Sequence, residues 1–175
     1  MSTLTAPCPL ADYHDLDQFS CGVPALDNWL KKRARSNERS RASRTYVLCI
    51  DKRVIGYYAL ASGSLAAKYA PGKIKRNMPD PIPVMVLGRL AIDKEHQGKK
   101  LGDALLRDAI LRILQAAEIA GIKAILVAEI AGIKAILVHA ISEEAKQFYL
   151  DRSFTISPTE PMTLILPLES ILGKL

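Results

Sequence analysis

Apolar residues in the first third of the chain recur at near-helical spacing. Leu26, Trp29, Leu30 and Ala34 follow a proline, and the positions between them are mostly polar or basic. This pattern predicts an amphipathic helix over residues 27–36 with its basic residues on the outer face. The polar and basic stretch that follows, residues 36–43, predicts a loop or a frayed helix end.

The pattern then changes to extended runs of apolar and aromatic residues. Residues 45–50 and 54–62 predict two strands, and the polar residues 51–53 between them predict a hairpin. The stretch 71–83 is rich in proline, lysine and arginine, which predicts a surface loop. Residues 84–92 predict a further strand.

Helical spacing returns after this strand. The segment from 103 to about 120 predicts a helix, and its apolar stripe consists of Ala104, Leu105, Ile110, Leu111 and Leu114. Strand, loop, helix and strand follow one another here. This order predicts a βαβ-like core in an α/β or α+β domain.

An identical eleven-residue repeat, AEIAGIKAILV, occupies residues 117–127 and 128–138. One extra copy indicates a recent tandem duplication or an artefact, because a solenoid needs more repeats. We expect the second copy to supply the strand that leads into His139, and the first to lengthen the preceding helix by about three turns. The open alternative is that residues 122–127 form a strand in an added hairpin or a swapped edge.

Length and composition narrow the class of protein. With 175 residues and 49% hydrophobic content, the chain is expected to form one domain, 1–175, with a substantial core. Its apolar runs are too short to span a bilayer and its start lacks the pattern of a signal peptide, so a cytoplasmic protein without membrane contact is expected. Three widely spaced cysteines without a histidine cluster predict buried or idle thiols, with neither a disulfide framework nor a metal site.

The positive charge of the chain is unevenly distributed. The net charge is +6, and residues 31–44 contain seven basic residues against a single Glu38. Such a segment is either a solvated helix face or a surface that meets a polyanion such as a nucleic acid.

Residues 87–107, LGRLAIDKEHQGKKLGDALLR, join an apolar strand to a helix through a basic, glycine-bearing loop. Gln97, Gly98 and Gly102 bracket the turn, and Lys99 and Lys100 add positive charge. Unpaired amides and the macrodipole at a helix N-terminus attract a pyrophosphate. The alternative is an ordinary glycine-containing turn with solvated lysines, but the strand before the loop and the helix after it favour a phosphate site.

The spacing Gln97-x-x-Lys100-x-Gly102, placed after Leu90-Ala91-Ile92-Asp93, resembles the acetyl-CoA loop of the GNAT acetyltransferase superfamily. That loop usually reads Gln/Arg-x-x-Gly-x-Gly/Ala. Lys100 replaces its middle glycine and is expected to adopt the backbone angle of that glycine, which is strained for lysine if φ is positive.

The resemblance implies acetyl-CoA as the cofactor and an α+β (α/β-like) GNAT fold. In that fold a mixed, mostly antiparallel central sheet is flanked by helices and splays at the cofactor-binding strand. The residues that match the family's cofactor contacts are Leu90, Ala91, Ile92, Gln97, Gly98, Lys99, Lys100, Leu101 and Gly102.

Residues 142–154, SEEAKQFYLDRSF, predict a helix that begins at Ser142. They resemble the terminal GNAT motif Tyr-x-x-x-Gly-Phe, with Tyr149, Ser153 and Phe154 at its positions and Ser153 in place of the glycine. In the family the tyrosine hydroxyl approaches the cofactor sulfur.

Acetyl transfer needs a hydrogen-bond donor at one atom and a proton donor at another. The tetrahedral oxyanion needs a hydrogen-bond donor, which the family takes from a backbone amide in the strand that matches residues 90–92. The leaving thiolate needs a proton, and a phenol with a pKa near 10 can share or donate one, so Tyr149 is the predicted general acid. The alternative for Tyr149 is a half-buried core tyrosine.

The attacking amine must be neutral. The α-amino group of an aminoacyl ester, with a pKa at or below the roughly 7.7–8.0 of a peptide terminus, needs no strong base, whereas a lysine side chain near 10.4 does. His14, His96 and His139 read as solvated or packed imidazoles, so the sequence offers no convincing base. This indicates an amine of low pKa.

Over nearly its whole length the chain resembles the GNAT toxins of bacterial toxin–antitoxin pairs, in FSCGVPALDNWLKKRARSNERSRASRTYVLC, VIGYYALASGS and VLGRLAIDKEHQGKKLGDALLRDA. The resemblance implies that the chain acetylates the α-amino group of aminoacyl-tRNA and blocks translation. It implies a ribbon-helix-helix antitoxin, contact with operator DNA only through that antitoxin, and a homodimer. The positions that match the family's tRNA-facing surface are Lys31, Lys32, Arg35, Arg44, Arg76 and Arg89.

Such cations suit the many salt-sensitive phosphate contacts that a tRNA makes. Arg89 lies inside an apolar strand, and the alternative for it is an ion pair with Asp93 or another carboxylate.

Two other functions stay open at this point. One is a small-molecule or protein N-acetyltransferase, which the basic flank disfavours because a small cationic amine prefers an acidic pocket. The other is a toxin that the duplication or Lys100 has impaired, acting as a binding module or corepressor.

Overall fold

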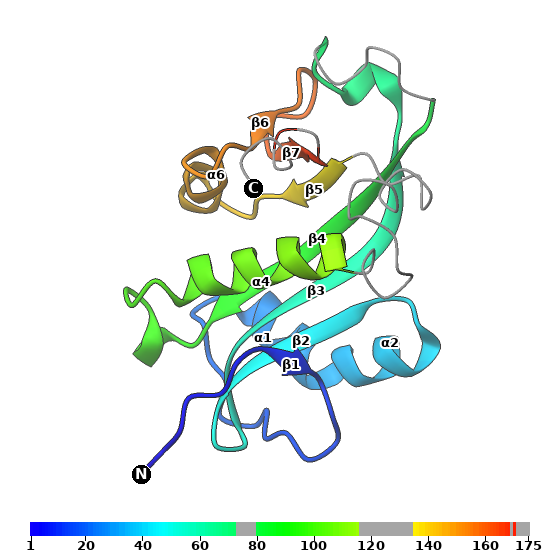
Figure 1. The fold of residues 1–175 in the computed structure, drawn as a ribbon. Coiled ribbons are helices and arrows are strands. Elements are labelled where there is room, and N and C mark those ends of the chain that lie inside the picture. Colours follow the sequence, from blue (N-terminus) through cyan, green and yellow to red (C-terminus); the bar gives the residue numbers. More distant parts are fainter. Residues whose placement is uncertain (73–79, 116–134, 169, 171–175) are drawn as a thin grey trace. The chain divides into compact units, whose positions relative to one another are not determined.

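The computed structural model describes residues 1–72, 80–115, 135–168 and 170, in two compact units (Figure 1). The first unit comprises Met1–Ala61 with Gly88–Leu111, and the second comprises Ser62–Leu87 with Arg112–Leu175. Strands β3 and β4 and helix α4 each run from one unit into the other. The single-domain organisation stays a prediction.

The strands form one mixed, mostly antiparallel sheet, as predicted. Its order is β1-β2-β3-β4-β5-β7-β6. The bounds of the strands are Cys8–Pro9 (β1), Arg44–Ile50 (β2), Arg53–Leu65 (β3), Ile82–Ile92 (β4), Ala135–His139 (β5), Thr155–Ile156 (β6) and Thr163–Pro167 (β7). The parallel pairing of β4 with β5 runs from Val84 to Leu87, so β4 continues past the segment that β5 pairs.

Four α-helices and two 3-10 turns are found in the described ranges. The α-helices are α1 (Pro24–Lys32), α2 (Ala34–Ser40), α4 (Leu101–Gln115) and α6 (Glu143–Leu150). The 3-10 turns are η1 (Ala67–Tyr69) and η2 (Lys94–His96). No helix among these residues is long and apolar enough to cross a membrane.

The hairpin β2–β3 confirms the strands predicted at 45–50 and 54–62. The two strands pair antiparallel, with Ile50 opposite Arg53, and β3 extends to Leu65. Strand β4 begins at Ile82, two residues earlier than expected, because a proline is tolerated near the start of a strand.

The single helix predicted over residues 27–36 is wrong in its bounds. Helix α1 begins at Pro24, because proline is favoured in the first turn, and Arg33 interrupts the path with a φ of −121°. Helix α2 (Ala34–Ser40) then covers most of residues 36–43, the stretch predicted as a loop or a frayed helix end. Its serines fit the helix because Ser36 and Ser40 donate their hydroxyls to carbonyls three residues earlier.

The apolar positions predicted for this helix are buried as expected, three of them on α1 and Ala34 at the start of α2. Leu26, Trp29, Leu30 and Ala34 are buried, in one cluster with Val47 and other residues of β2 and β3. This cluster forms the core of the first unit and fixes α1 against the sheet.

The apolar stripe predicted for α4 needs correction. The buried face is formed by Leu105, Leu106, Ala109, Ile113 and Leu114. Ala104 is exposed, and Ile110 and Leu111 are only half-buried. The face is set where α4 approaches β3: a Cβ on Gly56 would lie 3.2 Å from Cδ1 of Leu105.

The core of the second unit is formed by residues of β3, β4, β5 and β7 together with Ala70. It contains Leu65, Ala70, Ile82, Val84, Ala135, Leu137 and Ile165. Strand β5 comes from the second copy of the repeat, as predicted. The other residues of both copies lie outside the described residues, so the longer helix and the extra strand at 122–127 stay predictions.

Candidate functional site

The loop between β4 and α4 presents a row of backbone donors. Among the described residues, the amides of residues 98–102 donate no hydrogen bond. Gly98 has a φ of +77°, and α4 begins at Leu101, so these amides include the unpaired first turn of a fifteen-residue helix. Together with exposed Lys99 and Lys100, this arrangement fits a pyrophosphate.

Lys100 and Ser153 both have left-handed backbone, with φ of +59° and +73°. These are the positions where the acetyl-CoA loop and the terminal motif usually have glycine. The expectation that Lys100 adopts a glycine-like angle is confirmed, and Ser153 behaves in the same way. Both residues preserve the path of the chain at a cost in backbone strain.

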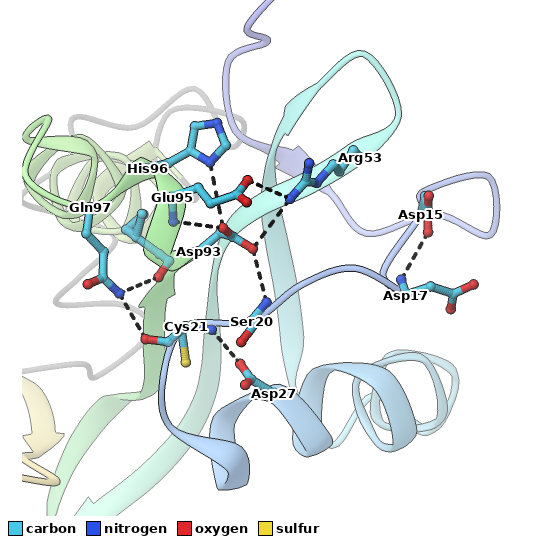
Figure 2. A network of polar contacts seen from close by, with 11 residues as sticks. Asp15, Asp17, Ser20, Cys21, Asp27, Arg53, Asp93, Glu95, His96 and Gln97 are labelled. Carbon is cyan, nitrogen blue, oxygen red and sulfur yellow. Dashed lines mark hydrogen bonds and ion pairs between the residues drawn. The ribbon is translucent and has the colours of Figure 1, made fainter.

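Asp93 fixes the start of the loop (Figure 2). Its side chain is 2% exposed, and it accepts hydrogen bonds from the amides of Ser20 (3.0 Å) and Glu95 (3.1 Å). Arg53 and His96 lie 3.9 Å and 3.8 Å from its carboxylate. The backbone of Asp93 also donates to the Ile55 carbonyl (2.8 Å).

Asp93, Glu95 and His96 offer ligand atoms within 4.8 Å of one another, as a metal site would. Protein donors already contact the carboxylate of Asp93, so we assign the cluster to holding the loop. Sequence reasoning missed this role. The sequence signal for this role is an aspartate that directly follows an apolar strand. Its carboxylate can accept a hydrogen bond from the backbone amide two residues later.

The side chain of Gln97 points into the loop base (Figure 2). Its Nε2 donates to the carbonyls of Cys21 and Ile92, at 2.9 Å each. Gln97 was predicted as a cofactor-binding residue. In the structure its side chain ties the loop to the end of β4 and to the segment before α1, and its contact with a cofactor stays a prediction.

Tyr149 lies on α6 in the second unit. Ser142 caps this helix as predicted, accepting the Ala145 amide at 3.1 Å. The Tyr149 ring is 8% exposed and packs edge-on against Phe154, with ring centroids 5.2 Å apart. Burial raises the pKa of Tyr149 to about 12, so the phenol stays protonated at neutral pH. Its hydroxyl has no hydrogen-bond partner in the described ranges.

The predicted tRNA-facing cations fall into two groups. Lys31 and Lys32 are exposed in the last turn of α1 and form no ion pair with any described residue. Arg44 pairs with Glu38 at 2.9 Å, and this hydrogen bond raises the pKa of Arg44. Arg35 donates to the His14 carbonyl at 2.6 Å and lies 3.9 Å from Asp12. Arg76 lies outside the described residues.

Arg89 has an aromatic partner. Its guanidinium carbon lies 4.3 Å from the ring centroid of Trp29. The alternative of an ion pair with Asp93 is wrong, since Asp93 contacts Arg53, and no carboxylate of the described chain pairs with Arg89. Burial lowers the pKa of Arg89.

Comparison with known proteins identifies relatives over almost the whole chain. Residues 10–140 match the acetyltransferase (GNAT) family. A tRNA-acetylating toxin of Mycobacterium tuberculosis is 49% identical over 166 residues, which are 95% of this chain and 93% of the toxin.

Solved structures of toxins match just as fully. AtaT complexed with acetyl-methionyl-tRNAfMet has a TM-score of 0.85 and 29% identity, covering 98% of this chain and 99% of that one. A tyrosine-to-phenylalanine mutant of AtaT, bound to the C-terminus of the antitoxin AtaR and acetyl-CoA, has a TM-score of 0.77 and 28% identity over 98% and 97%. An AtaT–AtaR complex bound to DNA has a TM-score of 0.72 and 29% identity over 97% and 99%.

Proposed function

Because this chain belongs to the GNAT acetyltransferase family, we propose that it transfers the acetyl group of acetyl-CoA to the α-amino group of aminoacyl-tRNA. The observation that carries this proposal is the 49% identity with a tRNA-acetylating toxin over 95% of the chain. An acetylated amine cannot attack a peptidyl ester, so the product blocks translation. The chain then acts as a toxin in the cytoplasm, where charged tRNA is used.

The first unit would hold the cofactor. The free amides of residues 98–102 would bind its pyrophosphate, with the charge of Lys99 and Lys100 favouring the anion. Acetyl-CoA, when bound, supplies an activated thioester. An amide in the segment Leu90–Ile92 would stabilise the negative charge that develops on the acetyl oxygen.

Tyr149 would serve the leaving sulfur. A phenol with a pKa of about 12 keeps its proton at neutral pH and can donate a hydrogen bond to a thiolate. The attacking amine loses a proton and the sulfur gains one. An α-amino group with a pKa at or below about 7.7–8.0 is at least half neutral near pH 8 without a protein base.

The similarity to AtaT also indicates which partners this chain binds. AtaT binds the antitoxin AtaR and, with it, DNA. We expect this chain to bind a ribbon-helix-helix antitoxin, to reach operator DNA only through it, and to form a homodimer.

The test is acetylation of charged tRNA with labelled acetyl-CoA. Tyr149→Phe should lower kcat about 100-fold or more and leave the KM for tRNA unchanged, because it removes a proton donor that acts on the sulfur. Tyr13→Phe is the matched control, since Tyr13 is an exposed tyrosine on the N-terminal segment. A version lacking residues 117–127 tests the repeat. Equal background labelling from all versions would refute the enzyme, and activity only in the shortened chain would show that the repeat disables it.

The pH dependence tests the role of the phenol. The wild-type rate should rise with pH as the amine loses its proton, with a midpoint near 7.7–8.0, and then stay level to about pH 11. Tyr149 contributes no earlier fall, because a raised pKa keeps the donor protonated to higher pH. A fall in kcat centred near pH 10, absent from Tyr149→Phe, would show that the phenol acts in catalysis without a raised pKa, whereas the same fall in both proteins would belong to another group.

A further inference from the structure

The dipeptide Ser20–Cys21 links the loop between β4 and α4 to helix α1 (Figure 2). Each of its four backbone polar groups forms a hydrogen bond, and three of these bonds join the loop. The Ser20 amide donates to the carboxylate of Asp93 at 3.0 Å, and the Ser20 carbonyl accepts from the Lys94 amide at 2.8 Å. The Cys21 carbonyl accepts from Nε2 of Gln97 at 2.9 Å. These three bonds fix the loop against the dipeptide.

The fourth bond joins the dipeptide to α1. Oδ1 of Asp27 accepts from the Cys21 amide at 2.9 Å. Asp27 lies in the first turn of α1, and Cys21 precedes the N-cap, Val23, by two residues. In a capping box, a first-turn acid bonds to the amide of the N-cap itself. The carboxylate of Asp27 instead reaches past the N-cap and holds a segment outside the helix.

Helix α1 is a firm anchor for this carboxylate. Leu26 and Trp29, on either side of Asp27, are each 9% exposed. The Leu26 carbonyl accepts a 2.8 Å hydrogen bond from the hydroxyl of Tyr57 on β3. The Trp29 ring is nearly parallel to the same tyrosine, at 11° and 6.0 Å between centroids. Asp27 is therefore fixed to the sheet through its own helix.

The loop needs a hold from outside because its path is strained and its donors are unpaired. Gly98 and Lys100 both have positive φ, which is costly for the lysine. The amides of residues 98–102 donate no hydrogen bond within the described part of the chain. A row of donors that is already held in place loses less freedom when an anion binds. Gln97 directly precedes this row, so its bond to Cys21 holds the row at its start.

We propose that Asp27 is a positioning residue for acetyl-CoA. It fixes Cys21, whose carbonyl holds Gln97 and with it the amides that would bind the pyrophosphate. The proposal rests on the cofactor site proposed above. Asp27 acts only through Cys21 and touches no atom of the cofactor. Its loss should therefore weaken cofactor binding and leave the chemical step unchanged.

The first test is the binding of acetyl-CoA, measured by titration calorimetry. Asp27→Ala should raise the Kd about threefold to tenfold, as expected for one lost hydrogen bond. Asp27→Asn removes the charge but keeps an oxygen acceptor, and should stay within about twofold of wild type. If the charge acted only through the helix dipole, Asp27→Asn would match Asp27→Ala and the proposal would be overturned.

Steady-state rates separate binding from chemistry. In Asp27→Ala the KM for acetyl-CoA should rise in step with the Kd, while kcat should stay that of wild type. A fall in kcat at saturating acetyl-CoA, with an unchanged KM, would place Asp27 in the chemical step and refute a positioning role.

Asn28→Gly is the matched control for a loss of helix stability. Asn28 is exposed on α1 beside Asp27, and glycine weakens a helix interior. This variant should lower the Tm and leave the Kd for acetyl-CoA unchanged. If it raises the Kd as much as Asp27→Ala does, the effect of Asp27 is only that of a weaker helix.

A shortened acetyl donor locates the effect on the cofactor. S-acetylpantetheine carries the same thioester as acetyl-CoA but has no pyrophosphate. With this donor, kcat/KM should be alike in wild type and Asp27→Ala, because the amides of residues 98–102 have no phosphate to hold. An equal loss of kcat/KM with both donors would show that Asp27 acts at the acetyl end.

A double-mutant cycle tests the route through Cys21. Adding Asp27→Ala to Gln97→Ala should raise the Kd for acetyl-CoA little further, because both changes remove the same support of the loop. Fold-changes that multiply in the double variant would mean that Asp27 does not act through Gln97.

The binding data also distinguish this inference from the function proposed above. If wild type binds no acetyl-CoA, the proposed cofactor site fails. If wild type binds acetyl-CoA and Asp27→Ala binds it equally well, only the role of Asp27 is overturned.

Discussion

Lys100 adopts a backbone conformation that L residues avoid. Its φ of +59° brings the Cβ of a non-glycine residue close to its own carbonyl oxygen. This conformation costs about 1–2 kcal/mol of folding free energy. We expect Lys100→Gly to be more stable than Lys100→Ala by about 1 kcal/mol. The alanine variant is the reference because both remove the charge. Urea unfolding measures the difference.

Lys99 is the matched control for this prediction. It is exposed on the same loop, and its φ is not positive. There Lys99→Gly should be less stable than Lys99→Ala, because glycine loses more backbone entropy on folding. The same sign at both positions would show that φ at Lys100 carries no strain.

Some residue-scale properties can be predicted from sequence and others depend on tertiary neighbours. The left-handed angle of Lys100 follows from a motif position where glycine is usual. The hydrogen bond from Arg35 to the His14 carbonyl does not, because it joins residues 21 positions apart through the packing of α2 on the N-terminal segment. The aromatic partner of Arg89 likewise depends on α1 lying over β4.

At the scale of elements, the turn from β4 to α4 depends on Gln97. Its two 2.9 Å hydrogen bonds satisfy the carbonyls of Cys21 and Ile92. Gln97→Ala should raise the KM for acetyl-CoA several-fold by loosening the amides of residues 98–102. Gln97→Glu should raise it further, because a carboxylate would face two carbonyl oxygens.

Gln18→Ala is the control, since Gln18 is exposed in the segment before α1. Initial rates at varied acetyl-CoA give the KM values, and a thermal melt reports folding. An unchanged KM in Gln97→Glu would mean that the loop keeps its form without this brace.

Element types could be predicted well from this sequence, whereas element ends could not. The hairpin β2–β3 and the order β4, α4, β5 follow from clear apolar periods. Helix α2 was not predicted as a regular helix because serines are typical of loops. In the structure the hydroxyls of Ser36 and Ser40 donate hydrogen bonds to backbone carbonyls three residues earlier. The buried face of α4 shares Leu105 and Leu114 with the predicted stripe, and its other members depend on how the helix packs, which periodicity alone does not reveal.

At the scale of the whole molecule, the net charge of +6 overstates the cations free to meet tRNA. Lys31 and Lys32 are exposed without an ion pair to a described residue, whereas Arg44 is bound to Glu38. We therefore expect Lys31→Gln and Lys32→Gln each to flatten the plot of log KM for tRNA against log salt by about 0.7–0.9, as one lost phosphate contact does. Arg44→Gln removes the same charge and should flatten it less. Initial rates between 50 and 200 mM salt, about the range where such slopes are resolved, measure this. Equal flattening in all three variants would show that the pair with Glu38 opens when tRNA binds.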